Sequence, residues 1–214
     1  MSEESTRDTV STMGALLVAA GAAAIFARIA REVGQGGTER FDQGTREWLQ
    51  SHRAPTLDVA VKPVTLLSMP AVIVPATLAL ALYLWRNDRR NAAIALMAAP
   101  ALAMSAGLSF STFLAQRNPP DAGDAPDGEV KEPSFPSGHT TGVTAEALSI
   151  AFVLGREGLS GPATLAALVG WPLLVGTTRA YRDRHWAADV IGGWVAGSGV
   201  AAACVLLYLL LPEG

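Results

Sequence analysis

Residues 178–211 read TRAYRDRHWAADVIGGWVAGSGVAAACVLLYLLL, and this stretch decides the fold. It begins with a short polar segment that holds several arginines and His185, and from Trp186 to Leu211 its only charged residue is Asp189. A helix needs about 20 predominantly apolar residues to cross a bilayer. The stretch therefore predicts a membrane helix that begins directly after a cluster of chemically active side chains.

A second motif of the same kind lies upstream, where Phe135-Pro136-Ser137-Gly138-His139 stands before an apolar run. Proline is not tolerated in a helix interior, so the helix is expected to begin after Pro136. Backbone N–H groups at a helix start form an anion site, and a glycine lets the anion approach closely. The hydroxyl of Ser137 adds a donor, and His139 is placed to give a proton to a leaving group. The simpler alternative is that Ser137 only caps the helix.

The composition of the whole chain agrees with a membrane protein. Half of its 214 residues are hydrophobic and only 16% are charged, which argues against a soluble domain. The net charge of −3 gives no electrostatic basis for binding nucleic acid. The single cysteine, Cys204, lies in an apolar run, so neither an intramolecular disulfide nor a structural zinc cluster is expected.

We expect an all-α fold, namely a polytopic bundle of six transmembrane helices that forms one domain over 1–214, with its core at about 12–211. The six apolar runs are 12–29, 64–85, 92–115, 140–154, 163–175 and 186–211. The stretch 41–57 mixes apolar and charged residues and is typical of an interfacial amphipathic helix between spans one and two. A secretory signal peptide is the alternative for the first run, but an acidic segment precedes it.

An even number of spans puts both termini on one side of the membrane. The ends of spans three and five then share a face with the starts of spans four and six. Arg117 and both motifs therefore lie on one surface. The basic turn 86–90 and Arg156 favour a cytoplasmic location for the opposite surface. We expect an integral protein of the plasma (inner) membrane with its site on the outer or periplasmic face.

His185 and Asp189 are four residues apart, which places both side chains on one face at a helix start. A carboxylate that binds one ring nitrogen fixes the tautomer and makes the other nitrogen a better nucleophile. Guanidinium groups such as those of Arg117 and Arg179 bind phosphate oxygens in a fork. The alternative for each arginine is that it reaches toward lipid headgroups. The set of groups predicts a site that holds and splits a phosphate ester.

These residues resemble the type 2 phosphatidic acid phosphatase superfamily. Its third motif, Ser-Arg-x5-His-x3-Asp, corresponds here to Thr178-Arg179-x5-His185-x3-Asp189, and its second motif, Pro-Ser-Gly-His, is intact at 136–139. The resemblance implies a nucleophile, a proton donor and an orienting carboxylate: His185, His139 and Asp189. It implies four phosphate-binding residues: Arg117, Ser137, Gly138 and Arg179. It implies no metal and no other cofactor.

The first motif of that superfamily, Lys-x6-Arg-Pro, is not intact. An alignment on Arg117 puts Phe110 at the lysine position and Asn118 at the proline position. An alignment that ends on Pro120 puts Thr112 at the lysine position instead. Neither alignment restores the lysine charge, which puts substrate range or rate in question.

We expect a phosphatase that acts on a lipid phosphate or diphosphate through a phosphohistidine. The plausible substrates are of the undecaprenyl diphosphate, phosphatidylglycerol phosphate or phosphatidic acid class. One alternative is a weak or inactive lipid-phosphate binder or transporter, and another is a phosphotransferase that uses the same histidine. The expected partners are this substrate and membrane lipids, not nucleic acid. The Gly193-x3-Gly197 pattern permits close helix contact, either within one protomer or in a homodimer.

Overall fold

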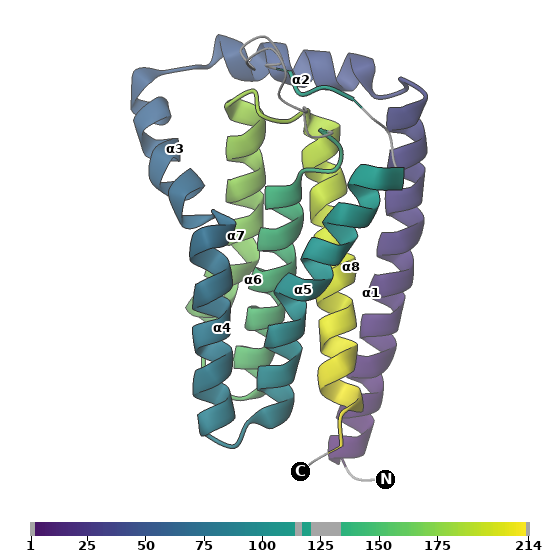
Figure 1. Ribbon diagram of the computed structural model, residues 1–214, viewed down its shortest axis with the longest axis vertical. Coiled ribbons are helices and arrows are strands. Elements are labelled where there is room, and N and C mark those ends of the chain that lie inside the picture. Colours follow the sequence, from purple (N-terminus) through teal and green to yellow (C-terminus); the bar gives the residue numbers. More distant parts are fainter. Residues whose placement is uncertain (1–2, 114–116, 121–133, 213–214) are drawn as a thin grey trace.

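The computed structural model describes residues 3–113, 117–120 and 134–212, which form eight α-helices and no strand. The helices are α1 (Glu3–Gly34), α2 (Glu39–Ser51), α3 (Pro55–Leu67), α4 (Pro70–Arg86), α5 (Arg90–Phe113), α6 (Gly138–Arg156), α7 (Pro162–Tyr181) and α8 (Ala187–Leu210). Most of them run lengthwise through the molecule, whereas α2 lies across one end (Figure 1). The all-α prediction is confirmed for these residues.

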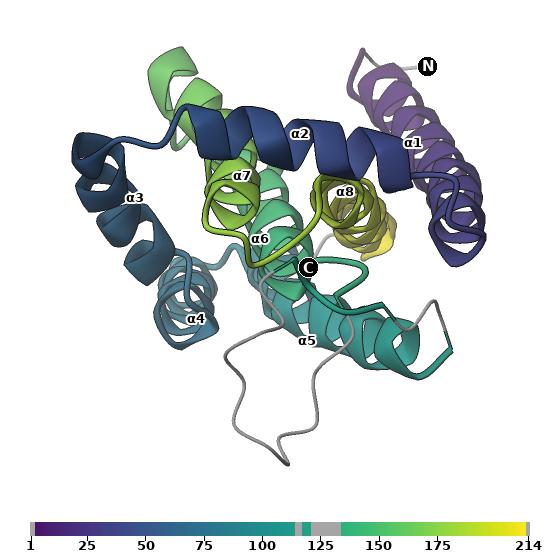
Figure 2. The same cartoon turned by 90° about the horizontal axis from the view of Figure 1, so that it is seen from above.

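Helix α6 lies at the centre of the bundle. It contacts α4, α5, α7 and α8, and Figure 2 shows it inside the ring of these helices when the bundle is seen from above. Its buried positions include polar residues such as Thr140, Thr144 and Glu146. A helix covered by protein on most sides does not need an apolar surface, which explains why the predicted run 140–154 is short.

Two glycines allow α8 to lie against α6 at short range. A Cβ atom added at Gly193 would lie 2.8 Å from Cβ of Thr140, and one added at Gly197 would lie 2.5 Å from Cβ of Thr144. Small residues permit such approach between membrane helices, where dispersion contacts supply much of the packing energy. The Gly193-x3-Gly197 surface is therefore used for packing within the chain, and a homodimer stays a prediction.

The apolar run 64–85, which the sequence predicts as the second span, does not form one straight helix, and its crossing of the membrane stays a prediction. Its first residues belong to α3, and α4 begins only at Pro70, with a bend of 47° between the two helices. Proline lacks an N–H group and disfavours helical geometry in the residue before it. Accordingly, Met69 is extended, with φ −64° and ψ 139°.

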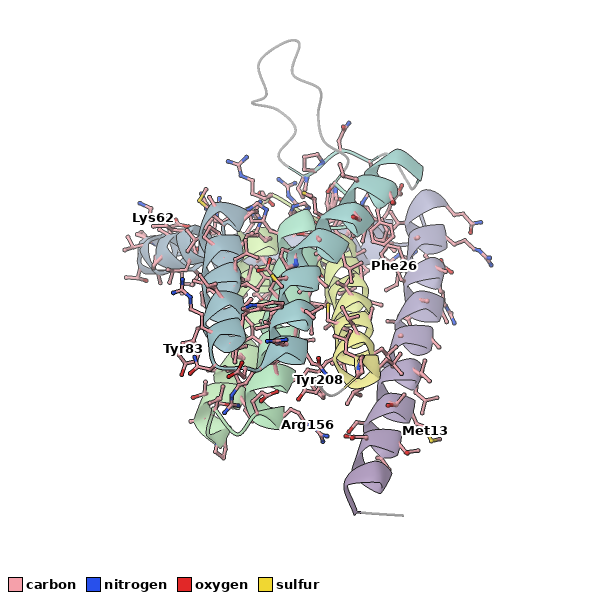
Figure 3. All side chains as sticks on the ribbon, turned by 60° about the horizontal axis from the view of Figure 1, so that its bottom comes forward. Met13, Phe26, Lys62, Tyr83, Arg156 and Tyr208 are labelled. Atoms are coloured by element: carbon pink, nitrogen blue, oxygen red, sulfur yellow. The ribbon has the colours of Figure 1, made fainter. Side chains whose placement is uncertain are left out.

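The outer surface of the bundle is apolar. Three helical segments are long and apolar enough to cross a membrane, namely Asp8–Gly34, Arg90–Phe110 and Ala187–Leu210, and the bent α3–α4 pair is a fourth candidate. Large side chains of α1, such as Leu17 and Met13, are more than half exposed, and Met13 points away from the bundle in Figure 3. The protein is therefore an integral membrane protein. The helices α6 and α7 do not meet the same apolar criterion, so the count of six spans stays a prediction.

Polar contacts join the helices at the end opposite α2. Nη1 of Arg89 lies 2.8 Å from a carboxylate oxygen of Glu157, and the hydroxyl of Tyr208 donates to the other oxygen at 2.8 Å. Arg156 pairs with Asp8 of α1 at this end, where Figure 3 labels Arg156 and Tyr208. The two charged turns that the sequence indicated thus lie on one side of the bundle.

Candidate active site

The start of α6, the end of α7 and the start of α8 carry the residues of the two motifs, and α2 crosses this end of the bundle (Figure 1). His139 is in the first turn of α6, Arg179 is in the last turn of α7, and Asp189 is in the first turn of α8. His185 lies in the short link between α7 and α8. Burial, together with the positive charges of Arg179 and His185, lowers the pKa of His139 to about 4. The bundle thus brings side chains from three helices into one electrostatic cluster.

Ser137 caps α6. Its hydroxyl oxygen accepts hydrogen bonds from the backbone N–H of Thr140 at 3.4 Å and from the Thr140 hydroxyl at 2.9 Å, and the Ser137 side chain is fully buried. The backbone N–H of Ser137 donates to the carbonyl of Asp189 at 3.0 Å, which ties the start of α6 to the start of α8. The capping alternative that the sequence left open is therefore present, and a phosphate contact by this residue stays a prediction.

Open space lies in front of the first turn of α6. Gly138 is exposed, and a Cβ atom added there would meet no atom within 4 Å. The N–H groups of Gly138 and His139 have no hydrogen-bond partner among the described residues. Two unpaired donors at the positive end of a helix, beside open space, are suited to an anion.

Arg179 has a buried hydrogen-bond donor, Nε, for which the described residues provide no acceptor. Burial, together with the positive charges of Arg182 and Arg184, lowers the pKa of Arg179 to about 10. Because a buried polar group without a partner is costly, this arrangement indicates that an anionic ligand completes the site.

His185 is held through one ring nitrogen. Its Nδ1 lies 3.0 Å from the carbonyl oxygen of Ser134 and 3.8 Å from Oδ2 of Asp189. A carbonyl only accepts hydrogen bonds, so Nδ1 carries the proton and Nε2 keeps its lone pair in the neutral ring. The expected contact with Asp189 is present as a close approach longer than a hydrogen bond, and the direct partner is Ser134.

The carboxylate of Asp189 is fully buried and accepts hydrogen bonds from three different residues. Its Oδ1 accepts two hydrogen bonds from Arg117, at 2.9 Å from Nε and 2.6 Å from Nη2. Its Oδ2 accepts the hydroxyl of Ser134 and the backbone N–H of Trp186, the latter at 2.9 Å. The carboxylate therefore fixes the link that carries His185.

Arg117 makes more protein contacts than the sequence indicated. Besides Asp189, it pairs with Asp42 of α2 through Nη1 at 2.8 Å, and the same atom donates to Thr38 at 3.3 Å. Its guanidinium also lies over the ring of Trp186, 5.8 Å from the ring centroid. All three guanidinium nitrogens have protein partners, so its role as a phosphate ligand stays a prediction. Sequence patterns gave no signal for Asp42 or Ser134, because neither belongs to a recognised motif.

The position aligned with the lysine of the first motif lies in an aromatic cluster. The ring of Phe110 on α5 lies 4.5 Å from that of Phe26 on α1, and Phe26 lies 5.6 Å from Phe135. The side chain of Thr112, the other aligned position, is outside the described residues. Among the basic residues near His185, Arg182 donates to Thr65 of α3 at 3.1 Å, whereas Arg184 is exposed.

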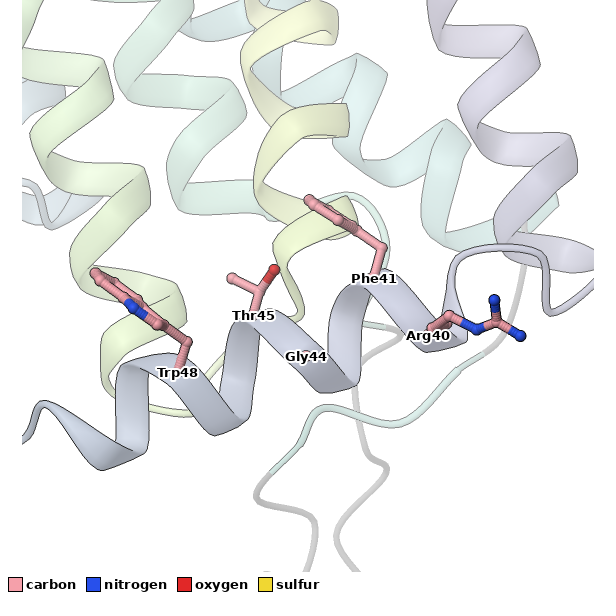
Figure 4. Close-up of a pocket in the computed structure, with 5 residues that line it drawn as sticks. All are labelled: Arg40, Phe41, Gly44, Thr45 and Trp48. Atoms are coloured by element: carbon pink, nitrogen blue, oxygen red, sulfur yellow. The ribbon is translucent and has the colours of Figure 1, made fainter.

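A shallow, open groove of about 390 Å³ lies on one face of α2, and all five of its lining residues belong to this helix (Figure 4). Its lining is mainly apolar, with Phe41 and Trp48 more than half exposed and Gly44 leaving room between them. Arg40 lies at one end of this lining, and Thr45 also borders a narrow crevice that reaches His185. The expected location of α2 at the membrane surface stays a prediction; an amphipathic helix placed there would present this apolar face to acyl chains.

The architecture is that of a helical integral membrane protein with a basic and histidine-containing site at one end. Residues 108–211 match the family model described as the PAP2 superfamily. This segment is similar to that superfamily, and it holds the second motif intact and the third motif with Thr178 in place of serine. The matched segment contains every site residue that the sequence predicted.

Two solved structures are similar to this fold. One is the first transmembrane PAP2 type phosphatidylglycerolphosphate phosphatase from Bacillus subtilis, with a TM-score of 0.76 and 18% identity over 88% of this chain and 94% of that chain. The other is Aquifex aeolicus LpxE, with a TM-score of 0.50 and 26% identity over 77% of this chain and 92% of that chain. Comparison with curated proteins gives no match. The fold is thus one that a membrane phosphatase of the superfamily uses.

Proposed function

We propose that the protein is a phosphatase that hydrolyses a lipid phosphate or diphosphate at a membrane surface. The observation that carries this proposal is the buried, unpartnered Nε of Arg179 in the same cluster as His139 and His185. A phosphate oxygen bound there would satisfy the arginine, and the free N–H groups of Gly138 and His139 would hold further oxygens.

The reaction proceeds in two displacements. Nε2 of His185 attacks phosphorus while the bond between phosphorus and the leaving oxygen breaks. In the free site the pKa of His139 is lowered to about 4, and a bound phosphate anion opposes this shift by offsetting the positive charge of Arg179. His139 then binds a proton in the complex and gives it to the leaving oxygen. Water then attacks the phosphohistidine with His139 as base, which releases inorganic phosphate and restores both histidines. Arg179 stabilises the charge that spreads over the phosphoryl oxygens. No metal is needed for either step.

The groove along α2 supports a lipid as the substrate. An apolar chain in the groove of Phe41 and Trp48 would place the headgroup near the end of the bundle that carries His185. Substrates of the undecaprenyl diphosphate, phosphatidylglycerol phosphate and phosphatidic acid classes all combine such a chain with a phosphate. Six spans, with the site on the outer face of the plasma membrane, complete the proposal.

A weak or inactive lipid-phosphate binder is a second candidate. The observation that favours it is Phe110, which places an aromatic ring where the superfamily has a lysine. Such a protein would bind phosphorylated lipid through Arg179 without releasing phosphate.

One experiment separates these candidates. Purified protein in detergent with EDTA is incubated with each lipid class, and released phosphate is measured for the wild type, His185→Ala and His52→Ala. We expect release by the wild type and by His52→Ala, because the hydrogen bonds of His52 within the described residues go to Ser51 and Trp48 beside it on α2. We expect only background release by His185→Ala. Lipid binding without release by the wild type would favour the binder, and release by His185→Ala would exclude the mechanism.

A further inference from the structure

Asp42 is a buried charge on an otherwise exposed helix. Its side chain is 2% exposed, and it is the only residue of α2 that is buried. Burying a carboxylate is costly unless it is paired and hydrogen-bonded. The position lies outside the segment that matches the superfamily, so neither the motifs nor the match assigns a role to it.

One oxygen of Asp42 caps α8 from another helix. Oδ1 accepts the backbone N–H of Ala188 at 2.8 Å. The residue at the N-cap position of α8 is Trp186, whose indole is a donor only and cannot accept a backbone N–H. The acceptor that a serine or aspartate would normally supply at this position therefore comes from α2.

The other oxygen of Asp42, Oδ2, pairs with Arg117, which in turn pairs with Asp189. Nη1 of Arg117 lies 2.8 Å from Oδ2 of Asp42, while Nε and Nη2 of the same guanidinium donate to Asp189. The planar guanidinium thus joins two buried carboxylates from helices α2 and α8. Asp42 holds the Nη1 end of this guanidinium, together with the Thr38 hydroxyl and the Trp186 ring, and so helps to keep Nε and Nη2 directed at Asp189.

We propose that Asp42 is a positioning residue of the active site, which acts through Arg117 to keep Asp189 and the link carrying His185 in place. The effect of Asp42 on catalysis rests on the proposed function. Its effect on the positions of Asp189 and His185 rests on the observed contacts alone. Through Asp42 the interfacial helix α2, which borders the hydrocarbon groove, is part of the catalytic unit.

Substitutions separate the two contacts of Asp42. Asp42→Asn keeps an oxygen for the Ala188 N–H but turns an amide NH₂ toward Arg117, whereas Asp42→Ala removes both contacts. Glu47→Gln is the matched control, because it removes one exposed carboxylate from the same helix. We expect Asp42→Asn to lower kcat about tenfold, with KM within about twofold of the wild type, because a charge-assisted contact is lost outside the substrate site. Glu47→Gln should match the wild type.

A double variant tests whether Asp42 acts through Arg117. In an Arg117→Gln background, Asp42→Asn should lower kcat by less than about twofold, since the residue it acts through is already gone. Independent effects that multiply would overturn the proposal. Wild-type kcat in both Asp42→Asn and Asp42→Ala would also overturn it.

NMR of the histidine rings tests the positioning role of Asp42 without measuring activity, so it applies even if the proposed function is wrong. The chain has three histidines, so ¹⁵N NMR of ring-labelled protein in micelles reports on each of them. Asp42→Asn should shift the ring signals of His185 and leave those of His52 unchanged. Unchanged His185 signals would overturn the positioning role, and changes at all three histidines would show general unfolding instead. If the wild type is inactive but Asp42→Asn still shifts the His185 signals, the proposed function is wrong and the positioning role of Asp42 is supported.

Discussion

His185 and Ser134 are joined by a hydrogen bond of 3.0 Å between Nδ1 and the Ser134 carbonyl oxygen. The hydroxyl of the same serine donates to Asp189, so one residue connects the histidine with the carboxylate through its main chain and its side chain. The main-chain contact orients the ring directly, and the carboxylate secures the serine that provides it. The role of Asp189 toward the histidine is therefore largely indirect.

We expect Asp189→Asn to reduce kcat strongly but to leave more activity than His185→Ala. The amide keeps one acceptor, but its NH₂ group opposes either Arg117 or the donors at Oδ2, while the Ser134 carbonyl still binds His185. A loss of about ten- to hundredfold follows from one or two charge-assisted contacts of ~1.5–3 kcal/mol each. Phosphate release in detergent measures both variants, and equal residual activity would show that Asp189 is as essential as the nucleophile.

Arg179 should be the main phosphate ligand from the helices. Arg179→Ala removes the buried Nε and is expected to lower kcat/KM by about tenfold or more, since a charge-assisted contact to the phosphoryl group is lost. Arg179→Lys keeps the charge but not the fork, so it should recover only part of the loss. Arg86→Ala is the control, because its side chain is exposed at the end of α4, away from the site. A neutral Arg179→Ala would contradict the assignment.

A lysine introduced at position 110, as in the first motif of the superfamily, should not raise phosphate release above that of the wild type. Phe110 packs on Phe26, so Phe110→Lys places an ammonium group in an aromatic cluster and loses a ring pair worth about 1 kcal/mol. We expect a lower unfolding temperature and no gain in phosphate release, whereas Phe110→Leu should keep more of the stability. A clear rise in kcat/KM for the lysine variant would show that its side chain reaches the site.

The contact between α6 and α8 should be sensitive to a single methyl group. At Gly197 an added Cβ would lie 2.5 Å from the carbonyl oxygen of Thr141, so Gly197→Ala forces the helices apart at a cost of about 1–3 kcal/mol. Thermal unfolding in detergent should show a lower midpoint.

Gly170→Ala is the matched control for this prediction. Gly170 lies on α7 with no atom within 4 Å of an added Cβ, so alanine there should stabilise the helix by about 0.5–1 kcal/mol. Equal shifts for both variants would mean that close packing at Gly197 does not contribute to stability.

The sequence by itself determined the all-α class, the apolar character of the helices and the resemblance of the two motifs to one family. Apolar runs set where the helices lie, because a helix in lipid must satisfy its own backbone and present apolar side chains. The motif spacings identified His139, Arg179, His185 and Asp189, since these residues lie close to one another along the chain or at helix ends. Their gathering at one end followed from the alternating direction of the helices.

Only the tertiary structure decided which groups hold these residues in place. Arg117 and Asp42 are 75 positions apart, and Ala188 and Asp42 are 146 apart, so no local pattern connects them. Pro70 is a signal in the sequence for the break between α3 and α4. Hydropathy alone did not reveal this break, because residues 64–85 form one continuous apolar run. Long-range ion pairs depend on how helices pack and which of their faces meet. A single sequence records the residues that can form such pairs but not the packing that selects among them.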